Sequence, residues 1–146
     1  MKTSKIAIIN GPNINMLGIR EPEHYGNVQW KTIEQNLTET FDTELLFYQS
    51  NHMGNIVDYI QSQYLKIDGI IINPASFSTI GYPILDAIKA INVPFVEVHI
   101  SNIFSRGGWH SESVFLQDAV GVIVGFKNNV YSLAVQAILS YLNIKK

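Results

Sequence analysis

The residues of this sequence that are best suited to acid–base chemistry are a tyrosine, an arginine and a histidine. Tyr25 and Arg20 stand five positions apart in residues 10–26, NGPNINMLGIREPEHYG, a polar stretch that follows a short apolar run. A tyrosine accepts a proton only as tyrosinate, and because its free pKa is ~10 it needs a neighbouring positive charge, which Arg20 could supply. His99 could donate a proton to a leaving group, and asparagine side chains could hold an enolate oxygen. This set suits removal of a proton next to a carbonyl, followed by loss of water.

Each of these residues also has a purely structural interpretation, which the sequence leaves open. Asn13 follows Gly-Pro, where asparagine commonly serves a turn. Arg20 precedes Glu21, so the two could form a solvent-exposed ion pair. His99 could be a buried histidine bonded to the backbone. Strand alternation, however, places Glu97 on the same face as His99, where a carboxylate could orient the imidazole, and this favours a functional role for His99.

Composition and charge limit the classes to which this protein can belong. The chain has 146 residues, of which 47% are hydrophobic and 15% charged, and this predicts one globular domain spanning residues 1–146. The formal net charge is -2 and there is no run of Lys or Arg, which argues against a nucleic-acid partner. The absence of cysteine excludes disulfides, thiolate metal sites and a cysteine nucleophile.

Other classes of ligand and location find little support in the sequence. No HxxxH or HxH spacing favours a metal site, and neither GxxxxGK[ST] nor GxGxxG marks a phosphate loop. The apolar stretch near the N-terminus is too short for a signal peptide, and no segment approaches the ~20 apolar residues of a membrane span. We therefore expect a cytoplasmic protein that performs metal-free acid–base chemistry and binds no membrane.

The elements that must position these residues are short β-branched runs that alternate with amphipathic segments. Five continuous apolar runs are typical of strands that are covered on both faces, at residues 5–10, 43–50, 68–74, 94–101 and 121–126. Four segments are typical of helices, centred on 32–40 and covering 54–65, 82–91 and 129–143, and Leu65 and Tyr64 are expected on the apolar face of the second. This order predicts an α/β, flavodoxin-like fold with an open parallel five-stranded sheet and helices on both faces.

Most of the polar candidates follow the ends of these predicted strands. Because ligands bind beyond the carboxyl ends of the strands in such sheets, we expect the candidates to converge at one edge. The clusters that follow the first four strands are Asn13, Arg20 and Tyr25; Asn51 and His52; Asn73, Ser76, Ser78 and Thr79; and His99, Ser101, Asn102, Arg106 and His110.

The chain resembles the type II 3-dehydroquinate dehydratase family of the shikimate pathway. The resemblance covers nearly the whole chain and rests on NGPNINMLGIREPEHYG, QSNHMGNIVDYI, GIIINP, LDAI, PFVEVHISN and GVIVGF. Two of these motifs, NGPNINMLGIREPEHYG and PFVEVHISN, are specific for the family when they occur together. The resemblance implies a homododecamer, a tetramer of trimers, that eliminates water in anti fashion from 3-dehydroquinate through an enolate, giving 3-dehydroshikimate without metal, cofactor or Schiff base.

The resemblance also implies roles for the proton-transfer residues. Tyr25 would be the base that takes the proton from C2, and Arg20 would favour its ionised form. Asn13 would hold a water that stabilises the enolate. His99 would be the general acid for the leaving hydroxyl, oriented by Glu97.

A second group of residues is implied to bind the substrate. Asn73, Ile100 and Ser101 would bind its hydroxyl and carboxylate groups. Asp86 would reach into the site from a neighbouring subunit. Arg106 matches a second arginine that the family carries in the mobile region of its active site.

The sequence departs from the family pattern at three binding positions. The family's QSNHEG has Met53 here, the histidine of its T-H-T-S is Thr79, and the second arginine of its R-E-x-F-R is His110, after Gly107 and Gly108. The proton-transfer set is intact while part of the binding shell has changed. Three hypotheses follow: a working 3-dehydroquinate dehydratase with an altered pocket, a paralogue that dehydrates a related cyclic hydroxy-ketone acid, and a non-enzymatic binding protein on the same scaffold.

Overall fold

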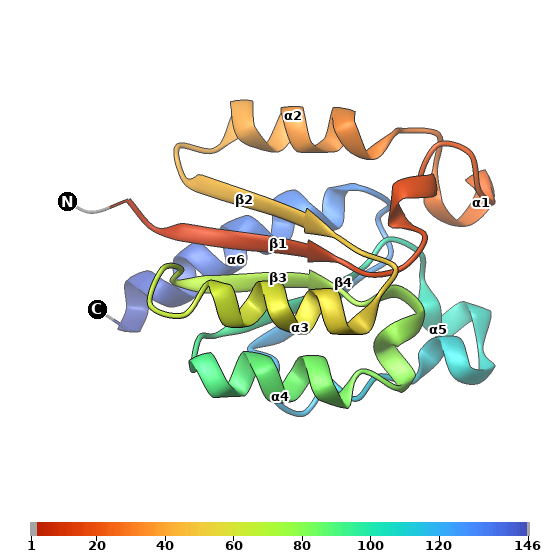
Figure 1. The fold of residues 1–146 in the computed structure, drawn as a ribbon. Helices are drawn as coiled ribbons and strands as arrows, with labels where there is room; N and C mark the ends of the chain where they lie inside the picture. The colour runs from red at the N-terminus through yellow and green to blue at the C-terminus, as the bar shows by residue number, and fades with distance from the viewer. Residues whose placement is uncertain (1–2, 146) are drawn as a thin grey trace.

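The computed structural model describes residues 3–145 and contains a five-stranded, all-parallel sheet (Figure 1). The strands are β1 (Lys5–Asn10), β2 (Glu44–Gln49), β3 (Gly69–Asn73), β4 (Phe95–His99) and β5 (Gly121–Val124). Their order across the sheet is β2-β1-β3-β4-β5. This is the flavodoxin-like order, so the expected fold class is confirmed.

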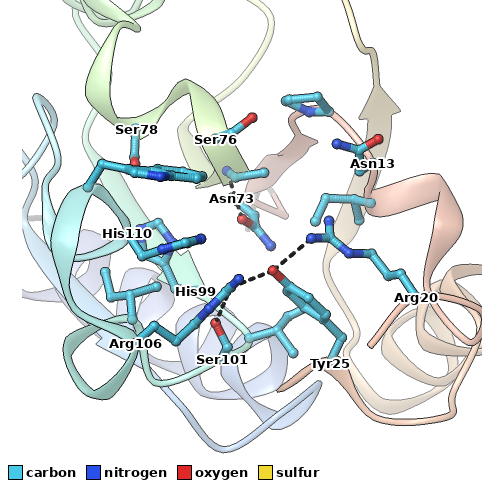
Figure 2. Close-up of a pocket in the computed structure, with 16 residues that line it drawn as sticks. Asn13, Arg20, Tyr25, Asn73, Ser76, Ser78, His99, Ser101, Arg106 and His110 are labelled. Carbon is cyan, nitrogen blue, oxygen red and sulfur yellow. Dashed lines mark hydrogen bonds between the residues drawn. The ribbon is translucent and has the colours of Figure 1, made fainter. Parts of the chain in front are cut away.

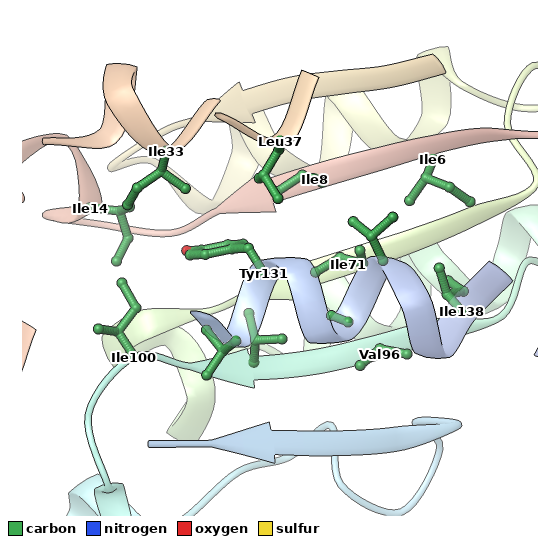
Figure 3. Close-up of a cluster of buried hydrophobic side chains, with 14 of the residues drawn as sticks. Ile6, Ile8, Ile14, Ile33, Leu37, Ile71, Val96, Ile100, Tyr131 and Ile138 are labelled. Atoms are coloured by element: carbon green, nitrogen blue, oxygen red, sulfur yellow. The ribbon is translucent and has the colours of Figure 1, made fainter. Parts of the chain in front are cut away.

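Four longer helices cover both faces of this sheet, as expected. They are α2 (Trp30–Thr40), α3 (Met53–Ser62), α4 (Tyr82–Ile91) and α6 (Asn129–Lys145). Alternation along β1 sends Ile6 and Ile8 into the core beneath α2 and α6, and sends Ala7 and Ile9 into the core beneath α3 and α4. Figure 3 shows the first of these cores, with Tyr131 of α6 among the aliphatic side chains.

Two expectations about burial are wrong. Helix α3 ends at Ser62, earlier than its periodicity predicted, and the chain then turns through Leu65 at a positive φ of 62°. The Leu65 side chain is 85% exposed and Tyr64 is also exposed, so neither belongs to the apolar face of the helix. Strand β5 was expected to be buried like the others, yet Val122 is exposed because β5 is an edge strand.

Short helices form within the loops at the carboxyl ends of the strands, where the sequence pattern marked no further helix. They are the 3-10 helices η1 (Ile14–Met16), η2 (Ala75–Thr79) and η3 (Gly108–Ser111) and the α-helical turns α1 (Pro22–Tyr25) and α5 (Ile103–Arg106). In Figure 1, α1 and α5 lie beyond the arrowheads of the strands. Within residues 3–145, no helix is both long and apolar enough to cross a bilayer.

The loops after β1 and β3 approach each other closely at Gly11. Its backbone N–H donates to the Asn73 carbonyl oxygen at 2.7 Å. A Cβ atom at Gly11 would lie 2.2 Å from the Pro74 carbonyl oxygen, which is far inside van der Waals contact. Only glycine fits here, and its small size brings the two loops together at the edge of the sheet.

Candidate active site

A cavity of about 280 Å³ opens at the carboxyl ends of the strands (Figure 2). Its walls come from the segments that follow β1, β3 and β4. Eleven of the sequence-predicted residues line it: Asn13, Arg20, Tyr25, Asn73, Ser76, Ser78, His99, Ile100, Ser101, Arg106 and His110. The expected convergence of these candidates at one edge is therefore observed.

The hydroxyl of Tyr25 lies between two guanidinium groups. Arg20 Nη2 donates to Tyr25 Oη at 2.9 Å, and Arg106 Nη1 donates to the same oxygen at 2.6 Å. The Arg20 guanidinium carbon also lies 4.0 Å from the centroid of the Tyr25 ring. Tyr25 is the last residue of α1 and Arg106 the last of α5, so two short helices from distant parts of the chain position this contact. Two positive charges at one phenol oxygen stabilise the negative charge of a phenolate.

The lining of the cavity is rich in cations. Arg20 and Arg106 contribute two positive charges, His99 and His110 contribute two imidazoles, and no Asp or Glu within residues 3–145 lines the cavity. Such a lining favours an anionic ligand, and guanidinium groups suit a carboxylate.

His99 is held by a buried carboxylate. Its Nε2 lies 2.6 Å from Glu97 Oε2, and the two residues are 4% and 0% exposed. The two residues share one face of β4, as strand alternation predicted. With Nε2 engaged, Nδ1 is the ring nitrogen left for a ligand in the cavity. The other carboxylate oxygen, Glu97 Oε1, is buried and has no hydrogen-bond partner among residues 3–145.

Asn73 belongs to a buried chain of hydrogen bonds. The Ala75 N–H donates to Asn73 Oδ1 at 3.1 Å, Asn73 Nδ2 donates to Tyr131 Oη at 2.9 Å, and Tyr131 Oη donates to Asn10 Oδ1 at 2.7 Å. Burial raises the pKa of Tyr131, against the opposite effect of the Asn73 hydrogen bond, so its hydroxyl stays protonated. Ser101, which also lines the cavity, accepts a hydrogen bond at Oγ from Arg106 Nη1 at 3.3 Å.

A cluster of amides positions Asn13. This residue has a positive φ of 70°, a conformation that asparagine tolerates better than most residues. Its N–H donates to Asn51 Oδ1 at 3.0 Å, and Gln49 Nε2 donates to the same oxygen at 3.2 Å. Asn51 therefore supports the loop that carries Asn13 and does not itself line the cavity.

Three of the positions singled out in the sequence lie away from the cavity. Thr79 is not among the residues that line it, although its neighbour Ser78 is. Met53 is also outside it, and Asp86 lines a separate surface hollow with Tyr82 of the same helix. Among the described residues, no group of three or more His, Asp or Glu side chains gathers as it would to hold a metal ion.

Several lining residues and one supporting residue were not predicted from the sequence. Trp109 lines the cavity and stacks on His110, with ring centroids 3.8 Å apart and an interplanar angle of 24°. Ile14 and Ile103 also line it, and Tyr131 supports Asn73 from the core. Apolar lining residues look like any core residue in a sequence, so no sequence pattern could have marked them.

Comparisons with known proteins agree on one family. The family model for dehydroquinase class II matches residues 4–139. A 3-dehydroquinate dehydratase from Prochlorococcus marinus (strain MIT 9301) is 48% identical over 143 residues, covering 96% of this chain and 97% of the relative. One from Clostridium botulinum (strain Loch Maree / Type A3) is 44% identical over 146 residues, covering 98% and 99%.

Solved structures give the same result. The type II dehydroquinase from Butyrivibrio crossotus DSM 2876 superposes with a TM-score of 0.88 at 38% identity, covering 92% of this chain and 97% of the other. The type II dehydroquinase from Propionibacterium acnes also gives 0.88, at 29% identity, covering 94% and 97%. The match of family model, relatives and folds over nearly the whole length shows that this chain belongs to the class II dehydroquinase family.

Proposed function

We propose that this chain is a 3-dehydroquinate dehydratase that removes water from its substrate in anti fashion through an enolate, giving 3-dehydroshikimate. The observation that carries the proposal is the Tyr25 hydroxyl, which contacts two guanidinium nitrogens at 2.9 and 2.6 Å at the wall of a cationic cavity. The membership of the family and the names of its relatives support the same substrate. This function belongs to the shikimate pathway.

In the first step, the Tyr25 phenolate takes a proton from C2, next to the ketone. The electron pair of the broken C–H bond moves to form the enolate, whose oxygen carries the negative charge. Arg20 and Arg106 stabilise the phenolate before transfer. Asn13, which lines the cavity, holds a water that donates to the enolate oxygen.

In the second step, the enolate returns to the ketone, its electron pair forms a double bond between C1 and C2, and the bond between C1 and the hydroxyl oxygen breaks. His99 gives its proton to the departing hydroxyl, which leaves as water. Glu97, 2.6 Å from His99 Nε2, fixes the ring and balances the charge of the imidazolium. The proton taken by Tyr25 returns to solvent and His99 is reprotonated, so the enzyme is restored.

The remaining wall of the cavity binds the substrate in this proposal. Asn73, Ile100 and Ser101 hold its hydroxyl and carboxylate oxygens. His110 stands where the family pattern has an arginine and adds a further donor to the cationic lining. Thr79 stands where the family pattern has a histidine; it does not line the cavity, so we expect it to contribute through its neighbour Ser78.

The proposed assembly is a homododecamer, a tetramer of trimers. Asp86 lies in a hollow of its own, away from the cavity of the same chain, which suits a residue that serves a neighbouring subunit. Light scattering of the purified protein tests the assembly, and a mass near that of one chain, 16.4 kDa, would exclude it. The cytoplasmic location stays a prediction.

The function is tested by the rise in absorbance of the conjugated enone when purified protein meets 3-dehydroquinate. Tyr25→Phe should abolish the rise, while Tyr64→Phe, which removes an exposed hydroxyl outside the cavity, should retain it. Turnover that survives Tyr25→Phe would refute the mechanism. Absence of turnover by the folded wild-type protein would refute the substrate, and related cyclic hydroxy-ketone acids would be tried next.

A further inference from the structure

Tyr131 is a buried residue whose hydroxyl points towards the site without lining it. It lies near the start of α6, is 0% exposed, and packs its ring against Trp30 at a centroid distance of 5.0 Å. Figure 3 shows its oxygen directed towards the carboxyl ends of the strands. There it meets the Asn10 and Asn73 amides at 2.7 and 2.9 Å. A buried phenol normally keeps such partners.

The directions of these hydrogen bonds determine one another. The Ala75 backbone N–H can only donate, so the Asn73 atom that it meets must be Oδ1. Nδ2 is then the Asn73 atom that faces Tyr131, and an amide nitrogen can only donate. The Tyr131 hydroxyl must accept there, so its single hydrogen goes to Asn10 Oδ1.

This chain of hydrogen bonds leaves the Asn73 side chain with one free N–H group. Its Oδ1 is bound to Ala75, one hydrogen of Nδ2 is bound to Tyr131, and the second hydrogen of Nδ2 remains for a ligand in the cavity that Asn73 lines. We propose that Tyr131 is a positioning residue that holds the Asn73 amide as a preorganised donor to a substrate oxygen. The inference deepens the proposed dehydratase function, and its kinetic test rests on that function.

The end of the hydrogen-bond network at Asn10 indicates that stability alone does not explain the network. Asn10 Nδ2 is buried and has no hydrogen-bond partner among residues 3–145. A buried polar group without a partner is unfavourable, and an apolar replacement of such a network is often no less stable. Orientation of the Asn73 amide is a role that explains why the chain has this network.

Tyr131→Phe tests the inference, because it removes only the hydroxyl and keeps the ring in the core. We expect KM for 3-dehydroquinate to rise about threefold to tenfold, the effect of one net hydrogen bond, while kcat stays within about twofold. The matched control is Tyr59→Phe on α3, which removes a half-buried hydroxyl outside the cavity and should leave both constants unchanged. Wild-type KM in Tyr131→Phe would overturn the inference.

A double variant separates positioning from a general structural effect. If Tyr131 acts through Asn73, then Asn73→Ala and Asn73→Ala/Tyr131→Phe should have the same KM. Losses that multiply would overturn the inference, since Tyr131 would then act by another route.

Crystal structures of the wild type and of Tyr131→Phe give a readout that needs no activity. If the wild type does not turn over 3-dehydroquinate, the proposed function fails, and these structures decide the inference by themselves. An Asn73 amide that turns or splits into two positions in Tyr131→Phe supports it. An amide that stays in place overturns it.

Discussion

Replacing Arg20 or Arg106 by alanine removes one of the two positive charges at the Tyr25 hydroxyl. The nitrogen–oxygen distances are 2.9 and 2.6 Å, so both contacts are full hydrogen bonds. A hydrogen bond that involves a charged group contributes about 1.5–3 kcal/mol net, which corresponds to about a tenfold to hundredfold loss of rate. We expect Arg106→Ala to lose more than Arg20→Ala, since Arg106 makes the shorter contact and also holds Ser101.

The assay is the steady-state rise in enone absorbance, which gives kcat and KM separately. Because Tyr25 acts in proton removal, the loss should appear in kcat. Arg106→Gln keeps a donor without the charge and should resemble Arg106→Ala. Lys31→Gln removes a positive charge from the exposed side of α2 and is the matched control.

Chemical rescue sharpens this prediction. Guanidinium ion added to Arg106→Ala can occupy the space left by the side chain and should restore part of kcat, whereas it should not restore Tyr25→Phe. Wild-type kcat in both alanine variants would refute the electrostatic reasoning. An equal loss in Lys31→Gln would show that overall charge, rather than contact with Tyr25, is responsible.

Four further predictions concern the site and its support. Glu97→Gln keeps the buried volume but removes the charge beside His99, so kcat should fall about tenfold to hundredfold, and a change in KM alone would contradict the acid role. His110→Ala should raise KM about threefold to tenfold with kcat little changed, because the side chain lines the cavity as a proposed ligand; an unchanged KM would remove it from the binding set. Gly11→Ala should fail to fold or should melt at least ~10 °C lower by circular dichroism, because its Cβ would meet a carbonyl oxygen at 2.2 Å. Burial raises the pKa of Tyr131 above the value of ~10 that it has in the unfolded chain, so its contribution to the free energy of unfolding is full below about pH 10 and falls progressively as the pH rises from there towards the pKa of the folded state. Urea unfolding from about pH 8 to pH 11 measures this, and Tyr131→Phe should lack that part of the alkaline fall.

Much of the fold follows from local patterns in the chain. Continuous β-branched runs such as residues 5–10 predicted buried parallel strands, and helical periodicity predicted 82–91, both of which the structure has at those bounds. The helix predicted at 54–65 was too long at its C-terminal end, because the apolar spacing continues past Ser62 whereas the backbone turns there. The exposure of Val122 could not be predicted, because an edge strand and a central strand can carry the same apolar run.

The sequence by itself determined which residues gather at the edge of the sheet. In a parallel sheet every strand ends at the same edge, so the order of strands along the chain already groups Asn13, Tyr25, Asn73 and His99. The pairing of Glu97 with His99 was also determined, because two residues on one strand separated by a single position must share a face.

Only the tertiary structure decided which of these groups touch. Arg106 and Tyr25 are 81 positions apart, and Tyr131 and Asn10 are 121 apart, so no local periodicity relates them. Their contacts depend on how α5, α1 and α6 pack on the sheet, to within a few tenths of an ångström. Hydrogen bonds are made or lost over such distances, while a pattern of residue types specifies position only to the level of an element and a face.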